Sequence, residues 1–171
     1  MIKIQILLFI VFVWNLRCES VVALLKSVED NDNLHMVYKQ KEFICKPYGI
    51  QSINELISSV ETNSSCMNYL QDFRKSYPKE KFFAQMRLHV QQKYSVEGID
   101  GKCLLYLSSS HTYSEAILEA GYARMPITLK HDDSFLKYRF KRALQRAKSS
   151  KLGIWSDVNV RNCFLARPKQ N

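Results

Sequence analysis

The order of its periodic segments limits most strongly what this chain of 171 residues can fold into. Three apolar, β-branched runs separated by polar turns come first, and they predict strands in a meander at 21–28, 34–39 and 43–50. Between 63 and 77 the apolar residues recur at every third or fourth position, which predicts a helix that ends before Pro78. The first part of the chain is therefore expected to be a small sheet followed by a helix.

Two more strands are predicted after this helix. Apolar and polar residues alternate strictly over 82–90, the pattern of a half-buried strand. The turn residues Asp100 and Gly101 then lead into a short apolar strand at 102–107. The composition, 46% apolar and 24% charged, is typical of a single globular domain, and no linker rich in Pro, Gly or Ser divides the chain.

Two further helices complete the pattern. Thr112 and Glu115 have the spacing of a capping box, which predicts the start of a short helix that Gly121 ends. A last helix is expected from the polar residues 132–134 to Gly153. Five short strands with a helix between the third and the fourth are the layout of an α+β domain on a five-stranded β-barrel of the OB type, here with three α-helices.

Residues 1–20 have the pattern of a secretory signal peptide. Lys3 precedes an apolar run at 4–13, and the sequence then becomes polar up to Ser20. This run is too short for the roughly 20 residues of a spanning helix, so we expect a secreted or periplasmic protein without a transmembrane helix after cleavage. An uncleaved anchor is the alternative. Cleavage before Glu19 would remove Lys3 and Arg17 and lower the formal net charge from +9 to +7, so the basic surplus belongs to the folded part and attracts polyanions.

Four cysteines would remain after cleavage. No CxxC or Cys/His pattern has the spacing of a zinc site, so disulfides are favoured over metal ligation in an oxidising compartment. Four cysteines allow three pairings, and the spacing alone does not choose among them. The candidates are Cys45, Cys66, Cys103 and Cys163.

Three segments of the second half resemble the staphylococcal nuclease (thermonuclease) family. The segment 113–124 reads YSEAILEAGYAR and is similar to the family's helix, and 143–148 (ALQRAK) with 152–156 (LGIWS) is similar to its C-terminal motif. Earlier, the turn at Asp32 and the PYGI sequence at 47–50 lie where the family has its first catalytic loops. The resemblance covers residues 21–157 and leaves 158–171 as a C-terminal extension.

The resemblance implies a metal site that has lost most of its acids. Family nucleases hydrolyse phosphodiesters with one Ca²⁺ and a carboxylate that activates water. Asp32 matches the first metal ligand, but Gln51 replaces the second aspartate, Ser52 the threonine and Asn54 the general-base glutamate. Because Ca²⁺ affinity follows ligand charge, the resemblance implies that Asp32, the Gln51 side-chain oxygen and the Ser52 carbonyl would bind Ca²⁺ weakly at best. Glu55 lies one residue away and would act as base only if the loop shifted its register.

The phosphate clamp keeps its charge in this comparison. The family's two clamp arginines fall on Lys46 and Lys102, which can bind an anion but lack the planar fork that grips a phosphate. The site is thus expected to be positive and poor in carboxylates. Because the clamp residues converge on one phosphate in the family, the resemblance also favours disulfides between Cys45 and Cys103 and between Cys66 and Cys163.

These comparisons predict an exported nuclease-like domain with a degenerate site, which serves as a nucleic-acid-binding, protein-binding or structural module of the cell envelope or a secreted assembly. The alternative is an active secreted Ca²⁺-dependent endonuclease that uses Asp32, Glu55, Lys46 and Lys102.

Overall fold

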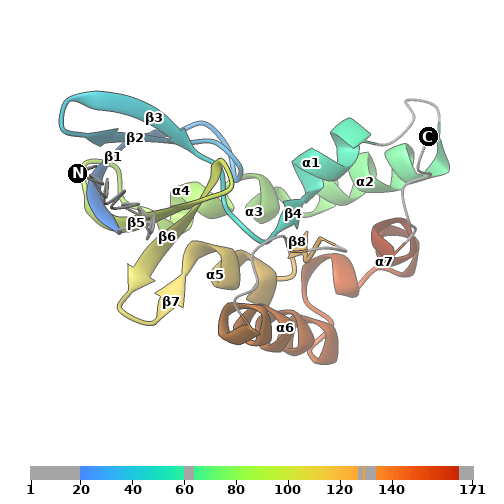
Figure 1. The fold of residues 1–171 in the computed structure, drawn as a ribbon. Helices are drawn as coiled ribbons and strands as arrows, with labels where there is room; N and C mark the ends of the chain where they lie inside the picture. The colour runs from blue at the N-terminus through green and yellow to red at the C-terminus, as the bar shows by residue number, and fades with distance from the viewer. Residues whose placement is uncertain (1–19, 60–63, 127–128, 130–133, 166–171) are drawn as a thin grey trace, which may run out of the picture.

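The computed structural model describes residues 20–59, 64–126, 129 and 134–165. The predicted signal peptide up to residue 19, the predicted cap residues Asp132 and Asp133, and residues 166–171 of the predicted extension lie outside these ranges. Within the described ranges the fold is α+β, as predicted, with one six-stranded antiparallel sheet and several helices (Figure 1).

The strands of the large sheet run in the order β3-β2-β1-β5-β6-β7. A second, two-stranded sheet pairs β4 with β8. The large sheet has six strands where five were expected, because β5 and the short β7 were not predicted and residues 82–90 do not form a strand. The strands are β1 (Val21–Val28), β2 (Leu34–Tyr38), β3 (Lys41–Cys45), β4 (Gln51–Ser52), β5 (Lys93–Ile99), β6 (Lys102–Ser108), β7 (His111–Thr112) and β8 (Ala123–Arg124).

Local sequence explains the centre of this sheet. In β1 the alternate residues Ala23 and Leu25 are fully buried, as the period of two requires. Between β5 and β6, Asp100 and Gly101 both have positive φ angles, 49° and 73°. This is the conformation of a tight hairpin turn, and it fixes the pairing of Ile99 with Lys102.

The segment that follows β3 approaches the start of β6. Pro47 and Cys103 form an isolated parallel bridge, in which the Cys103 amide donates to the Lys46 carbonyl and the Tyr48 amide to the Cys103 carbonyl, both at 2.8 Å. A disulfide joins Cys45 to Cys103 at the same place. The end of β3 is therefore tied to the start of β6 at one point, beside Lys46.

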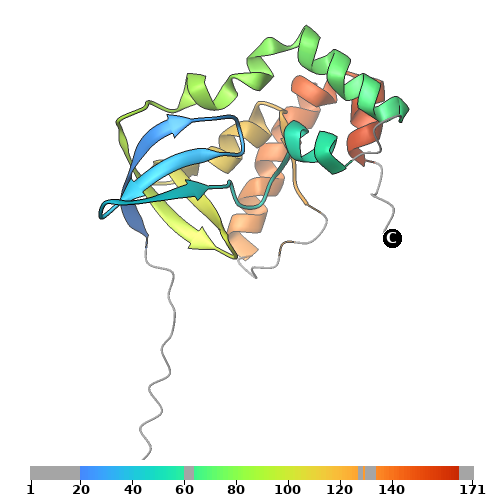
Figure 2. The same cartoon turned by 90° about the horizontal axis from the view of Figure 1, so that it is seen from above.

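The helices are more numerous than the three predicted. The described residues contain seven α-helices and one 3₁₀ helix (Figures 1 and 2). They are α1 (Ile53–Ser59), α2 (Ser65–Ser76), α3 (Pro78–Lys81), α4 (Phe83–Arg87), α5 (Tyr113–Glu119), α6 (Ser134–Ser149), η1 (Gly153–Trp155) and α7 (Val158–Leu165).

The strand predicted at 82–90 is wrong. These residues form α4, and the next strand is β5. Ala84 and Leu88, four residues apart, are buried on one side, whereas Phe82 and Met86 are exposed. The alternation of apolar residues in the sequence therefore does not match the burial, which follows helical spacing.

The start of α5 is fixed by a capping box and its end by Gly121. The predicted capping box of Thr112 and Glu115 is present at its start, and Gly121 after its end has a φ of 74°. Gly121 accepts a hydrogen bond from the Ile154 amide at 2.9 Å. A Cβ atom on Gly121 would lie 2.2 Å from the Leu152 carbonyl oxygen, so no other residue fits here without displacing η1.

Two separate apolar clusters hold these elements together. The first, the sheet core, combines residues of β1, β2, β5 and β6 with α4, α5 and the first half of α6. The second, the helical core, lies between α1, α2, α6, η1 and α7, and the Cys66–Cys163 disulfide joins α2 to α7 beside it. The packed unit therefore includes 158–165, the start of the predicted extension. The helical core consists of Ile53, Leu56, Leu70, Phe73, Ala147, Ile154, Trp155, Val160 and Phe164.

A membrane-spanning helix was not expected after cleavage. In the ranges given above, none of the helices is long and apolar enough to cross a membrane.

Candidate functional site

Four residues singled out in the sequence line a single pocket with a cavity volume of about 330 Å³. They come from four places: the β1–β2 turn, the segment after β3, the first turn of α1 and the first residue of β6. The fold therefore brings together residues that are far apart in the chain. These are Asp32, Lys46, Glu55 and Lys102, and Asp30, Asn33, Pro47, Asn54 and Ser58 complete the lining.

The two lysines are held close by backbone and disulfide contacts. Lys46 follows Cys45 and Lys102 precedes Cys103, so the disulfide and the bridge at Pro47 fix both main chains. The clamp positions implied by the resemblance thus line the same pocket. The disulfides are the two pairs that the resemblance favoured.

Glu55 reaches the pocket without any change of register. The Ser52 hydroxyl accepts a hydrogen bond from the Glu55 amide at 3.2 Å, at the start of α1. From the first turn of this helix, the Glu55 carboxylate lies 3.5 Å from the Lys102 ammonium group. Both side chains are partly exposed, so this ion pair contributes little to stability but sets the local charge.

Asp32 lies deeper in the pocket. Its carboxylate accepts a hydrogen bond from the buried Ser52 hydroxyl at 2.5 Å, and its amide donates to Asp30 within the turn. Burial raises the pKa of Asp32; the Ser52 hydrogen bond opposes this shift, and repulsion from Asp30 and Glu55 adds to it. Asp32 therefore holds its negative charge less readily than an exposed aspartate.

Gln51 is turned away from the role that the resemblance implies. Its side-chain oxygen accepts a hydrogen bond from Arg124 Nε at 2.7 Å, across the β4–β8 pair. Ser52 uses its hydroxyl on Asp32. In this arrangement the Gln51 side-chain oxygen would have to leave Arg124 before it could join Asp32 at a metal ion. Within the described ranges, no three His, Cys, Asp or Glu side chains are grouped so that they could hold a metal ion.

The pocket is less positive than the sequence suggested. Asp30, Asp32 and Glu55 face Lys46 and Lys102, so three carboxylates share the lining with two ammonium groups. Asp30 was not among the predicted site residues, although its position two residues before Asp32 in a polar turn was a usable signal.

Arg124 is a further cation beside the site and was not among the predicted site residues. Burial lowers its pKa, and the charge of Glu55 opposes that shift. Its guanidinium group also lies over the Phe164 ring at 5.9 Å, so it connects the edge of the site to the helical core. No local pattern in the sequence distinguishes Arg124 from an ordinary surface arginine.

A buried polar network supports the turn behind the pocket. Asn31 precedes Asp32 in this turn, and its side chain donates to the Glu80 carbonyl at 2.6 Å and accepts from the Ala84 amide at 2.9 Å. The Tyr113 hydroxyl donates to the Asn31 carbonyl at 3.2 Å. Asn31 thus ties the turn that carries Asp32 to α3, α4 and α5.

Glu80 is the most unusual member of this network. Its side chain is fully buried, and burial raises its pKa to about 7, although Arg74 opposes the shift. The Arg74 Nε atom lies 3.3 Å from the carboxylate, and Asn31 donates to it at 3.3 Å. A carboxyl group that titrates near neutrality therefore sits directly behind the pocket.

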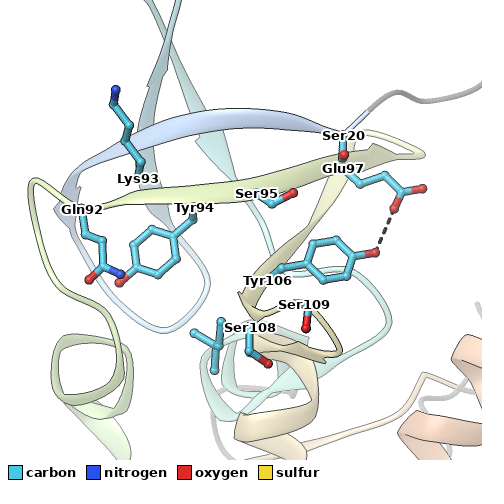
Figure 3. A pocket seen from close by; sticks show the side chains of 10 residues that line it. Ser20, Gln92, Lys93, Tyr94, Ser95, Glu97, Tyr106, Ser108 and Ser109 are labelled. Carbon is cyan, nitrogen blue, oxygen red and sulfur yellow. Dashed lines mark hydrogen bonds between the residues drawn. The ribbon is translucent and has the colours of Figure 1, made fainter.

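A different pocket, of about 520 Å³, lies along β5 and β6 (Figure 3). It is mainly polar, and the Tyr106 hydroxyl donates to Glu97 at 3.0 Å in its wall (Figure 3). Lys93 is the one lysine in its lining, and none of the residues selected in the sequence contributes to it. The predicted site residues and this pocket are therefore separate features.

The chain matches no model of a known protein family and no curated protein. The assignment of a function therefore depends on the geometry of the site.

Proposed function

We propose that this chain is an exported, nuclease-like module that binds the phosphodiester backbone of nucleic acid through Lys46 and Lys102 and does not hydrolyse it efficiently. One observation carries the proposal: the two lysines line the same pocket, fixed on both sides of one disulfide.

The lysines suit binding better than catalysis. Each ammonium group can donate to a phosphate oxygen, and charge-assisted hydrogen bonds of this kind are strong. Glu55 competes for Lys102, but the pair is partly exposed, so an incoming phosphate can displace it at little cost. Neither lysine offers the bidentate grip with which a clamp arginine stabilises a transition state.

The groups that hydrolysis would need are engaged or replaced. Asn54 lines the pocket at the general-base position and cannot take up a proton, which removes help worth about 10²- to 10⁴-fold in rate. Gln51 is bound to Arg124, and Asp32 is bound to Ser52. Binding can therefore persist where hydrolysis is weak.

The proposal includes an OB-type barrel and export. The antiparallel strands β1, β2, β3, β5 and β6, together with the bridge at Pro47, support a five-stranded barrel that β7 extends. The two disulfides are compatible with an oxidising compartment, as a secreted or periplasmic location would provide.

The test is the salt dependence of single-stranded DNA binding, followed by fluorescence anisotropy. The chain from Ser20 onward is used, because it contains both cores and both disulfides. The double variant Lys46→Ala/Lys102→Ala should weaken binding and make the slope of log K against log salt shallower by about 1.4, since each phosphate contact on a single strand contributes roughly 0.7.

The matched control is Lys79→Ala/Lys81→Ala, which removes the same charge from the exposed surface of α3. Equal effects of the two double variants would mean that binding is a property of net charge and would contradict the proposal.

The second candidate is an active Ca²⁺-dependent phosphodiesterase. It is favoured by the presence of Asp32, Glu55 and both lysines in one pocket, with Glu55 in reach of Lys102. This candidate predicts cleavage of DNA in Ca²⁺ that stops with chelator and in Asp32→Ala. Our proposal predicts intact DNA under the same conditions.

A further inference from the structure

Helix α6 carries exposed aromatic side chains on its outer side. Phe135 is 67% exposed and Tyr138 is 60% exposed, whereas Leu136, Phe140 and Ala143 are buried in the sheet core. The helix lies at the edge of the molecule, with α5 between it and the sheet (Figure 1). Burying a large aromatic side chain is favourable by a few kcal/mol. The Arg139 guanidinium group lies over the Phe135 ring at 5.7 Å, but both rings stay mostly in contact with water.

The same face is positively charged. The 16 residues of α6 include no acid. Two of its cations, Arg139 and Arg146, point toward α5 and pair with Glu115 and Glu119. On the outer side Lys137, Lys141 and Arg142 are exposed, and none of them has an ion-pair partner among the described residues.

We propose that this outer face of α6, formed by Phe135, Lys137, Tyr138, Lys141 and Arg142, docks on the surface of a bilayer that contains anionic phospholipids. In this arrangement the two aromatic rings enter the interfacial region. The cations lie at the level of the headgroup phosphates.

The shape and composition of the face favour a bilayer over a nucleic acid. Single-strand binders line a groove with cations and stack bases on aromatic rings. Here the rings and cations stand on the convex surface of one helix, which suits a broad, flat, negatively charged plane. Aromatic rings with lysines and arginines beside them are typical of helices at the membrane interface.

The test measures co-sedimentation of the chain from Ser20 onward with vesicles of phosphatidylcholine, with or without phosphatidylglycerol. This form lacks the apolar run at 4–13, which could bind lipid by itself. We expect binding only when phosphatidylglycerol is present. Each cation near an anionic surface strengthens binding about fivefold, so Lys141→Gln/Arg142→Gln should weaken it about 25-fold. Phe135→Gln/Tyr138→Gln should also weaken it several-fold.

Three control variants test whether the effect on vesicle binding is specific to α6. Lys79→Gln/Lys81→Gln and Phe82→Gln remove equivalent exposed cations and an exposed ring from α3 and the α3–α4 junction, and should leave vesicle binding unchanged. Lys46→Ala/Lys102→Ala should likewise bind vesicles normally, because the pocket is a separate site.

A tryptophan reporter distinguishes insertion of α6 side chains into the bilayer from purely electrostatic binding to its surface. In Tyr138→Trp the emission should shift to the blue when phosphatidylglycerol vesicles are added, and in Phe82→Trp it should not. The proposal is overturned by absent binding to anionic vesicles, by equal losses in the α3 controls, or by α6 variants that lower DNA binding and leave vesicle binding intact. The last result would assign this face to nucleic acid.

Discussion

The sheet core and the helical core differ in what is buried beside them. The members of both clusters are apolar side chains. Around the sheet core, however, the structure also buries polar and charged groups, among them Asn31, Glu80 and Glu115. Two of these groups support the turn that carries Asp32. The comparison indicates that the helical core mainly contributes stability. Beside the sheet core, burying polar groups costs some stability, but these groups hold the turn that lines the pocket.

The largest expected effects come from removing the disulfides in pairs. Cys45→Ser/Cys103→Ser opens a connection across 58 residues, and Cys66→Ser/Cys163→Ser opens one across 97. Loop-closure entropy predicts that each loss lowers the free energy of unfolding by about 4 to 5 kcal/mol. Urea unfolding measures both. If the two regions differ as described, only the first pair should also weaken DNA binding, because only that disulfide adjoins Lys46 and Lys102.

The next largest effect on the free energy of unfolding is expected from truncating a large side chain in the helical core. Phe73 is 3% exposed and stacks on Tyr77. Phe73→Ala should lower the free energy of unfolding by about 3 to 5 kcal/mol, since it removes apolar contacts and leaves a cavity. DNA affinity of the folded variant should stay unchanged. A large loss of affinity measured well below the unfolding transition would break the separation between the two cores.

The buried carboxyl group behind the pocket should make stability depend on pH. The pKa of Glu80 is raised from 4.5 to about 7, so the folded chain binds this proton more tightly than the unfolded chain. Its contribution to stability is complete at low pH and is lost as the pH rises from 4.5 through 7. At roughly 1.4 kcal/mol for each pKa unit, the loss is about 3 kcal/mol.

The variant Glu80→Gln cannot titrate and should lack this fall. Urea unfolding at pH 5 and at pH 8 gives the comparison, with Asp72→Asn on the exposed face of α2 as control. An identical pH dependence in the wild type and Glu80→Gln would show that the carboxyl group is not held in the way the structure indicates.

The smallest effect concerns the ion pair inside the pocket. Glu55→Gln frees Lys102 from its partner, and a partly exposed pair is worth at most about 1 kcal/mol. DNA affinity should therefore rise by up to about fivefold, as anisotropy can measure. The phosphodiesterase candidate predicts instead that this variant loses activity, so Ser58→Ala, on the same helix and in the same lining, serves as the control.

Sequence reasoning succeeded where local rules decide the structure. The alternation at Ala23 and Leu25, the Asp100–Gly101 turn and the capping box at Thr112 depend on neighbours within a few residues. It failed at 82–90, where the apolar residues of the sequence fit both the alternation of a strand and the spacing of a helix. There, Ala84 is held by a hydrogen bond to the distant Asn31, which no local pattern contains.

The site was only partly predictable, because several of its contacts depend on residues that are distant in the sequence. The resemblance selected Asp32, Lys46 and Lys102, which line one pocket. It did not reveal that Gln51 would be taken by Arg124, or that Glu55 would reach Lys102 without a shift, since both depend on how β4, β8 and α1 meet in space.

The most direct test of the central claim is ³¹P NMR of a dinucleoside phosphate mixed with the protein, first in chelator and then in Ca²⁺. Our account predicts that the diester resonance shifts or broadens, that Lys46→Ala/Lys102→Ala abolishes this change, and that the diester stays intact in Ca²⁺. A phosphomonoester resonance that grows in Ca²⁺ with the wild type, and not with Asp32→Ala, would contradict it.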